Sequence, residues 1–175
     1  MGLRPARCYH WDSPAYTRVA KNPQDSFIVG IPGSKISSYE RGGFKGKAEL
    51  ELSIVPQDKI QVRHNPLEAA RVAINKFLEN EVGLPNYKFK IRVYPHHVLR
   101  ENIMATGAGA DRVQSGMRQS FGKPIGRAAR VKKGQPIISV YILKDDERVK
   151  KVREALKRGV RKLPGEMKIV MQEIK

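Results

Sequence analysis

At 175 residues the chain is long enough for one compact domain with a hydrophobic core, and too short for two domains of ordinary size. Its 34 lysines and arginines outnumber its 17 aspartates and glutamates, and the resulting charge of +17 is spread along the whole chain. A chain so charged repels itself unless a polyanion neutralises it, so we expect a nucleic acid as its partner rather than a membrane, for which no apolar run is long enough.

The first 25 residues are predicted to form an irregular basic arm. Three prolines interrupt residues 1–25, and their apolar side chains follow neither a strand period nor a helix period. The arm carries Tyr9, Trp11 and Tyr16, and aromatic residues are depleted in disordered termini. These rings therefore need a surface to pack on, which is either the domain itself or a base of a nucleic acid.

Short strands follow the arm in this prediction. Residues 26–31 (SFIVGI) form a short apolar run that ends in a Pro-Gly turn. In residues 48–55 and 59–64 apolar and polar side chains alternate, which is typical of strands with one buried face. Residues 88–94 repeat this pattern with three cations on the outer face, which serve either solubility or contact with a nucleic acid.

A strand, a helix, a Leu-Pro pair and another strand occur in this order twice, in residues 59–94 and 136–174. In the first copy Asn65, which proline follows, is the expected helix cap, and Gly83 ends the helix. In the second copy Asp145 is the expected cap. Two such halves predict an α+β fold, a two-layer α/β sandwich in which two helices pack on one mainly antiparallel sheet.

Residues 95–123 have no place in that sandwich, and the most basic segment of the chain overlaps them. Residues 107–133 contain five glycines and seven lysines or arginines, with no acidic residue after Asp111. Glycines let a backbone approach phosphates closely, and arginines grip phosphates or stack on bases. We therefore expect residues 101–123 to form a mobile loop and a stem that bind RNA. An apolar stripe, spaced every four residues, predicts a short helix there: Val113, Met117 and Phe121.

The sequence contains no complete catalytic or nucleotide-binding motif. Gly107 and Gly109 begin a dinucleotide fingerprint, but Arg112 stands where its third glycine belongs. His96 and His97 are candidates for metal ligation or acid-base catalysis, yet neighbours in an extended segment point to opposite sides. We therefore expect that the protein binds no metal and no cofactor and is not an enzyme. The alternatives are an RNA-processing enzyme that uses one of these histidines and a free-standing RNA chaperone.

RNA is expected rather than DNA. The sequence shows no helix-turn-helix pattern, and Cys8, the single cysteine, cannot build a cysteine-based zinc finger. Dispersed charge, an aromatic arm and glycine-rich loops suit folded RNA, which proteins recognise by shape, phosphates and exposed bases. The absence of any internal disulfide fits an intracellular, reducing compartment.

Several long motifs resemble one family of proteins. Residues 108–135 (AGADRVQSGMRQSFGKPIGRAARVKKGQ) closely resemble the signature of the archaeal and eukaryotic large-subunit ribosomal protein L-ten-e, the counterpart of bacterial L-sixteen. Residues 4–9 (RPARCY), 67–77 (LEAARVAINKF) and 92–104 (RVYPHHVLRENIM) are similar to the same family in the same order. Eukaryotic members run on past the last strand, whereas this chain stops at Lys175, so an archaeal member is expected.

The resemblance implies a structural constituent of the large ribosomal subunit that is cytoplasmic and ribosome-bound. Its implied partners are large-subunit rRNA, neighbouring ribosomal proteins and, in the assembled ribosome, tRNA, with no DNA and no membrane. The family's position implies contact with rRNA near the path by which aminoacyl-tRNA is accommodated. The loop at residues 101–117 would then project towards the peptidyl transferase centre.

The resemblance also implies three groups of RNA-binding residues. The arm would contribute Arg4, Arg7, Tyr9 and Trp11, although Trp11 departs from the family pattern. The loop that faces tRNA and the catalytic RNA would contribute Arg112, Gln114, Met117 and Arg118. The stem would anchor rRNA through Lys123, Arg127, Arg130, Lys132 and Lys133.

Overall fold

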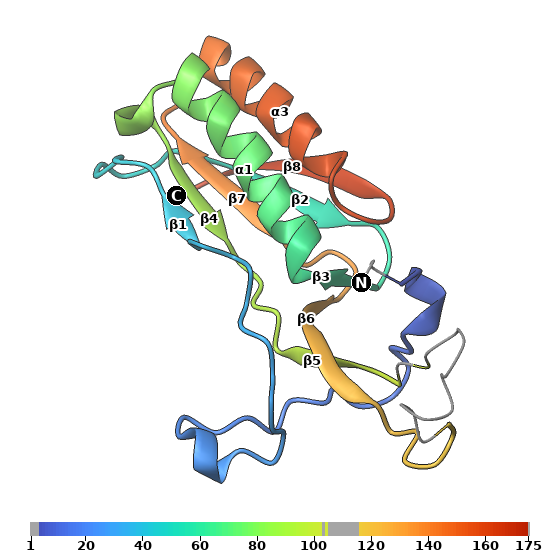
Figure 1. The fold of residues 1–175 in the computed structure, drawn as a ribbon. Coiled ribbons are helices and arrows are strands. Elements are labelled where there is room, and N and C mark those ends of the chain that lie inside the picture. The colour runs from blue at the N-terminus through green and yellow to red at the C-terminus, as the bar shows by residue number, and fades with distance from the viewer. Residues whose placement is uncertain (1–3, 103, 105–115, 175) are drawn as a thin grey trace.

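Two antiparallel sheets and two long helices make up the part of the chain that the computed structural model describes, residues 4–102, 104 and 116–174 (Figure 1). The helices are α1 (His64–Glu81) and α3 (Asp146–Val160). The strands are β1 (Glu40–Arg41), β2 (Leu50–Pro56), β3 (Ile60–Arg63), β4 (Lys88–Ile91), β5 (His97–Glu101), β6 (Lys123–Val131), β7 (Ile138–Ile142) and β8 (Met167–Glu173). Short 3-10 turns are η1 (Ala6–Cys8), η2 (Pro23–Asp25) and η3 (Leu84–Asn86). None of the described helices has both the length and the apolar character that crossing a bilayer requires.

The larger sheet carries the helix layer. Its strand order is β1-β4-β7-β2-β8, and all neighbouring strands are antiparallel. Figure 1 shows both helices side by side across one face of this sheet. The core between the two layers includes these fully buried side chains: Leu52, Ile54, Leu67, Ile74, Leu78, Phe89, Val140 and Leu156. The predicted sandwich of two helices on one mainly antiparallel sheet is confirmed.

The predicted cap is confirmed for α3 and is wrong for α1. Asp145 caps α3 as predicted, because its side chain accepts a hydrogen bond of 3.1 Å from the Glu147 N–H. In contrast, α1 begins at His64, and Asn65 lies inside its first turn rather than at its cap. The reason is that β3 leads directly into α1, so the chain becomes helical before it reaches the Asn-Pro pair.

Two glycines shape the helix layer. Gly83 follows α1 with a left-handed φ of 82°, and its N–H donates to the Leu78 carbonyl over 3.0 Å. Gly159 lies where α3 crosses α1, and a Cβ atom at this position would stand 2.4 Å from Cδ1 of Ile74. A side chain at residue 159 would therefore force Ile74 to shift if the helices kept this distance.

The second sheet was not predicted. It has the order β3-β6-β5 and lies beyond one end of the helix layer, next to the arm (Figure 1). The strand expected at 59–64 is β3, but it pairs with β6 instead of joining the larger sheet, which corrects its assignment. Local sequence does not indicate β6, because Pro124 and Gly126 are poor strand formers and two of its four buried positions are alanines.

The strand predicted at residues 26–31 is absent. Ile28 is buried and its N–H donates to the Arg18 carbonyl over 3.3 Å, but no ladder of hydrogen bonds follows. Gly30 has a φ of 72°, which ends the extended conformation that a strand requires. A short apolar run therefore folded against its own arm instead of a sheet.

The prediction of a short helix around the apolar stripe is also wrong for the residues that are described, 116–121. Val113 lies outside the described residues, while residues 116–121 form turns. Gly116 and Gln119 have φ values of 58° and 60°, and such left-handed residues cannot continue an α-helix.

Candidate nucleic-acid interface

The arm lies along the second sheet and is bonded to β5, the strand at one edge. The Tyr16 N–H donates to Nδ1 of His97 over 2.9 Å, and the Tyr16 carbonyl accepts from the Val98 N–H over 2.9 Å. At the end of β5, Glu101 accepts a charged hydrogen bond of 2.7 Å from Nε of Arg4. The described part of the arm, residues 4–25, and strands β3, β5 and β6 thus form one continuous surface, which we call the arm surface.

Aromatic and cationic side chains interleave on the arm surface. The Arg63 guanidinium lies over the Tyr9 ring, 4.4 Å from its centroid. Arg100 lies over two rings at once, 4.6 Å from that of Tyr16 and 3.9 Å from that of Phe121. The rings of Tyr9 and Tyr16 therefore pack on the domain itself rather than waiting for a base of a nucleic acid.

The predicted arm residues divide into two pairs. Arg4 and Tyr9 are both bonded to Glu101, the second through a hydrogen bond of 3.1 Å from its hydroxyl. Arg7 and Trp11 are exposed on the arm surface. The Arg4 side chain is also 52% exposed, so the two pairs differ in their bonds to Glu101 rather than in access to solvent.

Two of the four predicted loop residues are described. Arg112 and Gln114 fall outside the described residues. Met117 and Arg118 are exposed in the turns that precede β6. Their proposed contacts with RNA stay predictions.

The predicted stem residues separate by side-chain type. Lys123, Lys132 and Lys133 are exposed, whereas both arginines of the stem are bonded within the protein. Arg127 donates from Nε to the Pro32 carbonyl over 3.1 Å, and from Nη1 to the Tyr94 hydroxyl over 3.3 Å. Arg130 likewise ties the arm to the sheet. The lysines are therefore better placed for an external phosphate than the arginines.

Arg130 makes three contacts with its guanidinium. Nε donates to Oε1 of Gln61 over 3.1 Å, and Nη1 donates to the Ser13 carbonyl. Nη2 lies 3.3 Å from Nε2 of His97. Since Nδ1 of that ring accepts from the Tyr16 N–H, Nε2 carries the proton of the neutral imidazole and cannot accept from the guanidinium.

His96 and His97 do not form a catalytic pair. Burial, together with the positive charges of Arg130 and Arg100, lowers the pKa of His97 to about 4, so its imidazole is neutral at physiological pH. His96 is exposed, and its ring packs 4.6 Å from that of Tyr94. Among the residues with a described placement, no three potential metal ligands come together.

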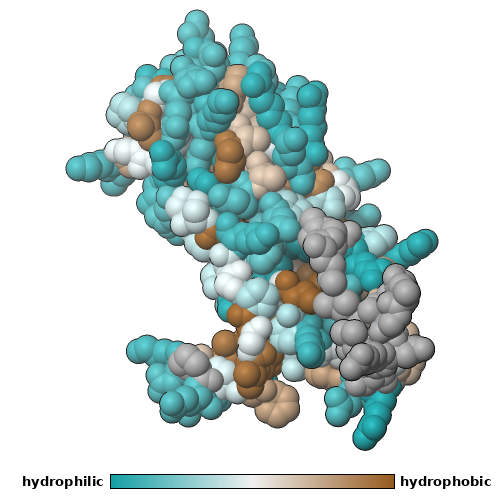
Figure 2. Space-filling view, viewed as in Figure 1, coloured by the Kyte–Doolittle hydropathy of each residue, from teal (hydrophilic) through white to brown (hydrophobic). Residues whose placement is uncertain are grey.

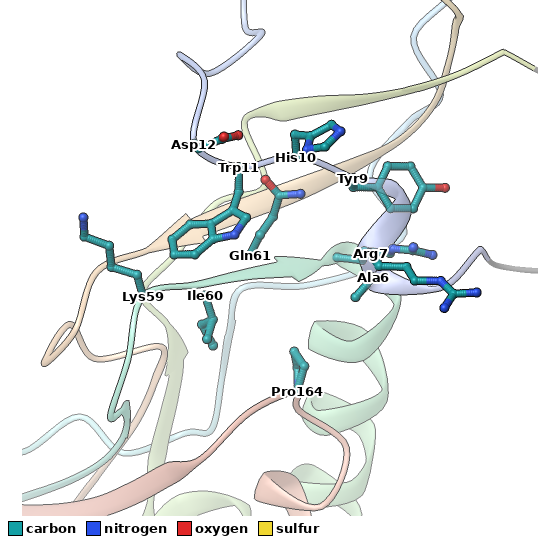
Figure 3. Close-up of a pocket in the computed structure, with 11 residues that line it drawn as sticks. Ala6, Arg7, Tyr9, His10, Trp11, Asp12, Lys59, Ile60, Gln61 and Pro164 are labelled. Atoms are coloured by element: carbon teal, nitrogen blue, oxygen red, sulfur yellow. The ribbon is translucent and has the colours of Figure 1, made fainter.

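A cavity of about 580 Å³ opens between the arm and β3. Trp11 is 48% exposed, and Figure 3 shows its indole reaching from the arm towards β3, beside Gln61. Lys59 and Arg7 lie at opposite ends of the cavity, and Pro164 approaches from the segment after α3. Of the residues that line this cavity, only Arg7, Tyr9 and Trp11 were predicted as site residues, and those that were not include Asp12, Lys59 and Gln61.

The β3 wall of this cavity could be read from the sequence only in part. Lys59, Gln61 and Arg63 alternate with apolar residues, which marks the outer row of a strand. Nothing local shows that the arm, some 50 positions earlier, covers that row.

Unpaired cations lie on and beside the arm surface, and also on α3, where Lys150, Arg153 and Lys157 are exposed and make no ion pair within the described ranges. Lys90 on β4 forms an ion pair with Glu40 over 2.6 Å, and Arg92, just after β4, forms one with Glu51 over 2.8 Å. These pairs favour a role in solubility, rather than in nucleic-acid contact, for the cations of residues 88–94. No ion pair within the described ranges involves the following exposed cations on or next to the arm surface: Arg7, Lys59, Lys123, Lys132 and Lys133.

Hydropathy differs between the two ends of the molecule. Figure 2 shows hydrophilic side chains over most of the helix layer, and hydrophobic ones gathered at the lower end, where Figure 1 places the arm. The exposed apolar side chains of the arm region include Val19, Phe27 and Val29. The arm end is therefore the face that offers apolar contact in addition to charge.

A family model and the individual relatives of the chain all point to the same protein family. Residues 12–170 match the family model described as ribosomal protein L16p/L10e. The chain is 50% identical to the large ribosomal subunit protein uL16 of Staphylothermus marinus, over 100% of this chain and 97% of that protein. It is 49% identical to uL16 of Methanococcus aeolicus, over 98% and 95% of the two chains. With uL16 of Archaeoglobus fulgidus the identity is 42%, over 99% and 95%.

Proposed function

The chain belongs to the L16p/L10e family of ribosomal proteins, and from this premise we propose that its arm surface binds large-subunit rRNA near the path of incoming aminoacyl-tRNA. The protein is a structural constituent of the large ribosomal subunit and not an enzyme. Its partners are rRNA and neighbouring ribosomal proteins. The finer proposal adds tRNA, in the assembled ribosome, as a contact of the loop.

The observation that carries the proposal is the one-sided charge of the arm surface. Arg7, Lys59 and the three stem lysines are exposed, and each lacks an ion pair within the described part of the chain. A surface with an excess of exposed positive charge attracts a polyanion, and phosphate contacts supply a large share of the affinity in protein–nucleic acid complexes. The family supplies the identity of that polyanion, which is rRNA.

The base of the loop supports its proposed projection towards the peptidyl transferase centre. The loop joins β5 to β6, which are paired, so its two ends start side by side. Gly122 fits against Glu101 so closely that a Cβ atom would stand 2.9 Å from the Glu101 carbonyl carbon. Nδ2 of Asn102 also donates to the Gly116 carbonyl over 3.4 Å. The described base of the loop is therefore held together at the end of the β5–β6 pair.

Salt dependence of binding tests the electrostatic part of the proposal. With a fragment of large-subunit rRNA, the slope of log K against log salt should be roughly −5 to −6 if about seven cations meet phosphates. The double variant Lys132→Gln, Lys133→Gln should make the slope shallower by about 1.5. The matched double variant Lys88→Gln, Lys90→Gln removes two lysines that pair with Glu40, and should leave the slope unchanged. A slope near zero would contradict the proposal.

Ribosome assembly tests the division between anchor and loop. Replacing Lys132 and Lys133 should reduce incorporation of the protein into large subunits. Arg112→Ala with Arg118→Ala should leave incorporation intact and slow translation, since those side chains are proposed to face tRNA. Loss of incorporation in the second variant would show that the division is wrong. RNA turnover by the purified protein that disappears in His97→Ala would instead support the enzyme alternative.

A further inference from the structure

Trp11 differs from the other two rings of the arm. Tyr9 is covered by Arg63 and bonded to Glu101, and Tyr16 is enclosed by Arg100 and its neighbouring ring. Among the described residues, no aromatic or cationic partner stacks on the Trp11 indole, which remains 48% exposed beside a cavity of about 580 Å³. A large ring in this position offers a face to something that is not part of the chain.

The walls of the cavity combine stacking, hydrogen-bonding and cationic groups. The Gln61 amide oxygen already accepts from Arg130, so its amide nitrogen is left as a donor. The Asp12 carboxylate offers an acceptor on the arm side. Lys59 and Arg7 stand at opposite ends of the cavity in Figure 3. This is the set of groups that one nucleotide needs: a face for the base, polar groups for its edge, and cations for the phosphates on either side.

Other occupants fit this cavity less well. An apolar peptide would have to displace water from the cationic ends without replacing their hydrogen bonds. An acidic peptide would satisfy the cations but leave the indole face without a flat partner. The volume is within the range of about 300 to 1,000 Å³ in which proteins bind small ligands, so a single base with its sugar can be accommodated.

We propose that this cavity holds one unstacked nucleotide of rRNA, with its base against Trp11 and its flanking phosphates near Lys59 and Arg7. The inference rests on the proposed function and adds the kind of RNA feature that the arm recognises. A nucleotide becomes available for such a pocket in a bulge or a loop, where it is not paired. The arm therefore recognises an extruded nucleotide, whereas the lysines of β6 and of the turn after it contact backbone phosphates of any RNA.

The single tryptophan of the chain makes the test direct, because intrinsic tryptophan fluorescence then reports Trp11 alone. Three RNA hairpins serve as probes: one fully paired, one with a single bulged adenosine, and one in which the bulged nucleotide lacks its base. All three should bind the full-length protein with a similar salt dependence. The hairpin with the bulged base should also quench the fluorescence and bind about tenfold more tightly than its abasic counterpart.

Two variants separate the pocket from a general effect of the arm. Trp11→Ala should remove the tenfold preference for the base while affinity for the paired hairpin stays within about twofold. Phe27→Ala removes an exposed ring just after the arm, 69% exposed and not among the residues that line the cavity, and should keep the preference. Urea unfolding of both variants confirms that they fold.

Specific outcomes overturn the inference. Equal affinity for the base-containing and abasic bulges, with unchanged fluorescence, refutes the pocket but leaves the proposed function standing, since salt-dependent binding persists. A Trp11→Ala variant that weakens all three hairpins equally assigns the ring a structural role instead. Failure of all three hairpins to bind the unaltered protein contradicts the proposed function itself.

Discussion

Arg130 shows how one side chain can serve the fold where RNA contact was expected. Its guanidinium joins Gln61 of β3 to the Ser13 carbonyl of the arm, 117 positions away. Charged hydrogen bonds of this kind contribute more to stability than neutral ones, and they orient the arm on which Arg7 and Trp11 are carried. Any effect of Arg130 on RNA binding is therefore expected to act through the position of the arm.

Replacing Arg130 by alanine should lower the free energy of unfolding by about 2 kcal/mol, because the Ser13 and Gln61 acceptors lose a charged donor. Arg130→Lys should recover only part of this, since an ammonium cannot reproduce the fork of the guanidinium. Urea denaturation measures the change, and faster hydrogen exchange at the Tyr16 amide would locate it in the arm. Lys132→Ala, at an exposed position, is the control with an expected change near zero. Unchanged exchange at Tyr16 would argue against this role.

Stability should fall in acid because His97 is neutral in the folded protein. Its folded pKa of about 4 lies below the value of about 6.5 in an unfolded chain, so the unfolded state binds the extra proton between these values. Stability is therefore complete above pH ~6.5 and is lost as the pH falls towards ~4. His64, whose pKa burial also lowers, acts in the same direction.

The variant His97→Asn should reduce the loss of stability between pH 7 and pH 4.5 by up to about 2 kcal/mol, because asparagine can accept from the Tyr16 N–H without titrating. Urea unfolding at both values measures the difference. His10→Asn, at an exposed position, should keep the dependence of the unaltered protein. A His97→Asn variant with the full original dependence would show that other groups cause it.

At the scale of elements, the close packing of α1 and α3 depends on the glycine at position 159. Gly159 would place a Cβ atom 2.4 and 2.6 Å from Cδ1 and Cγ1 of Ile74, so α1 and α3 meet with no room to spare. A glycine inside a helix is unfavourable in itself, by about 1 kcal/mol relative to alanine. Its presence here is explained by the close approach of the helices.

Gly159→Ala should therefore destabilise the protein by about 1 to 3 kcal/mol, although alanine is the better helix former, since the overpacked side chains must shift. Combining it with Ile74→Val should recover part of the loss. The matched control is Gly33→Ala, where a Cβ atom would meet nothing within 4 Å and φ is not left-handed. Denaturant midpoints distinguish these outcomes, and a more stable Gly159→Ala variant would contradict the packing argument.

The larger sheet and the helix layer are the elements that periodicity predicted well. The apolar alternation of β2 and the capped helix α3 depend on neighbours a few positions away, so they could be read directly. The second sheet could not be read, because β6 owes its pairing to β3 and β5, 60 or more and about 25 positions earlier. Its proline and glycine disfavour a strand locally, and only those partners overcome that preference.

At the scale of the whole molecule, the charge of +17 lowers the stability of the free protein by self-repulsion. Eight of the 17 acidic residues take part in ion pairs within the described part of the chain, among them Glu40, Glu68 and Glu79. The remaining cations repel one another across the surface, and this repulsion weakens the compact state until a polyanion is bound. Binding to rRNA therefore stabilises the fold as well as placing the protein.

Raising the salt concentration from about 50 mM to about 500 mM should raise the Tm of the free protein, because screening weakens repulsion between exposed charges. Short inorganic polyphosphate should have the same effect at much lower concentration. The triple variant Lys123→Gln, Lys132→Gln, Lys133→Gln should show a smaller rise. A Tm that falls with salt would mean that the surface ion pairs outweigh the repulsion.

The sequence alone determined the helices, the strands of the larger sheet with clear alternation, the cationic character and, through its motifs, the family. These features depend on residues a few positions apart or on composition. Only the tertiary structure decided that β3 pairs outside the larger sheet, that Arg127 and Arg130 bond within the protein, and that Trp11 lines a cavity. Each of these depends on which distant segment lies alongside, and such contacts are chosen by the packing of the whole chain rather than by local preference.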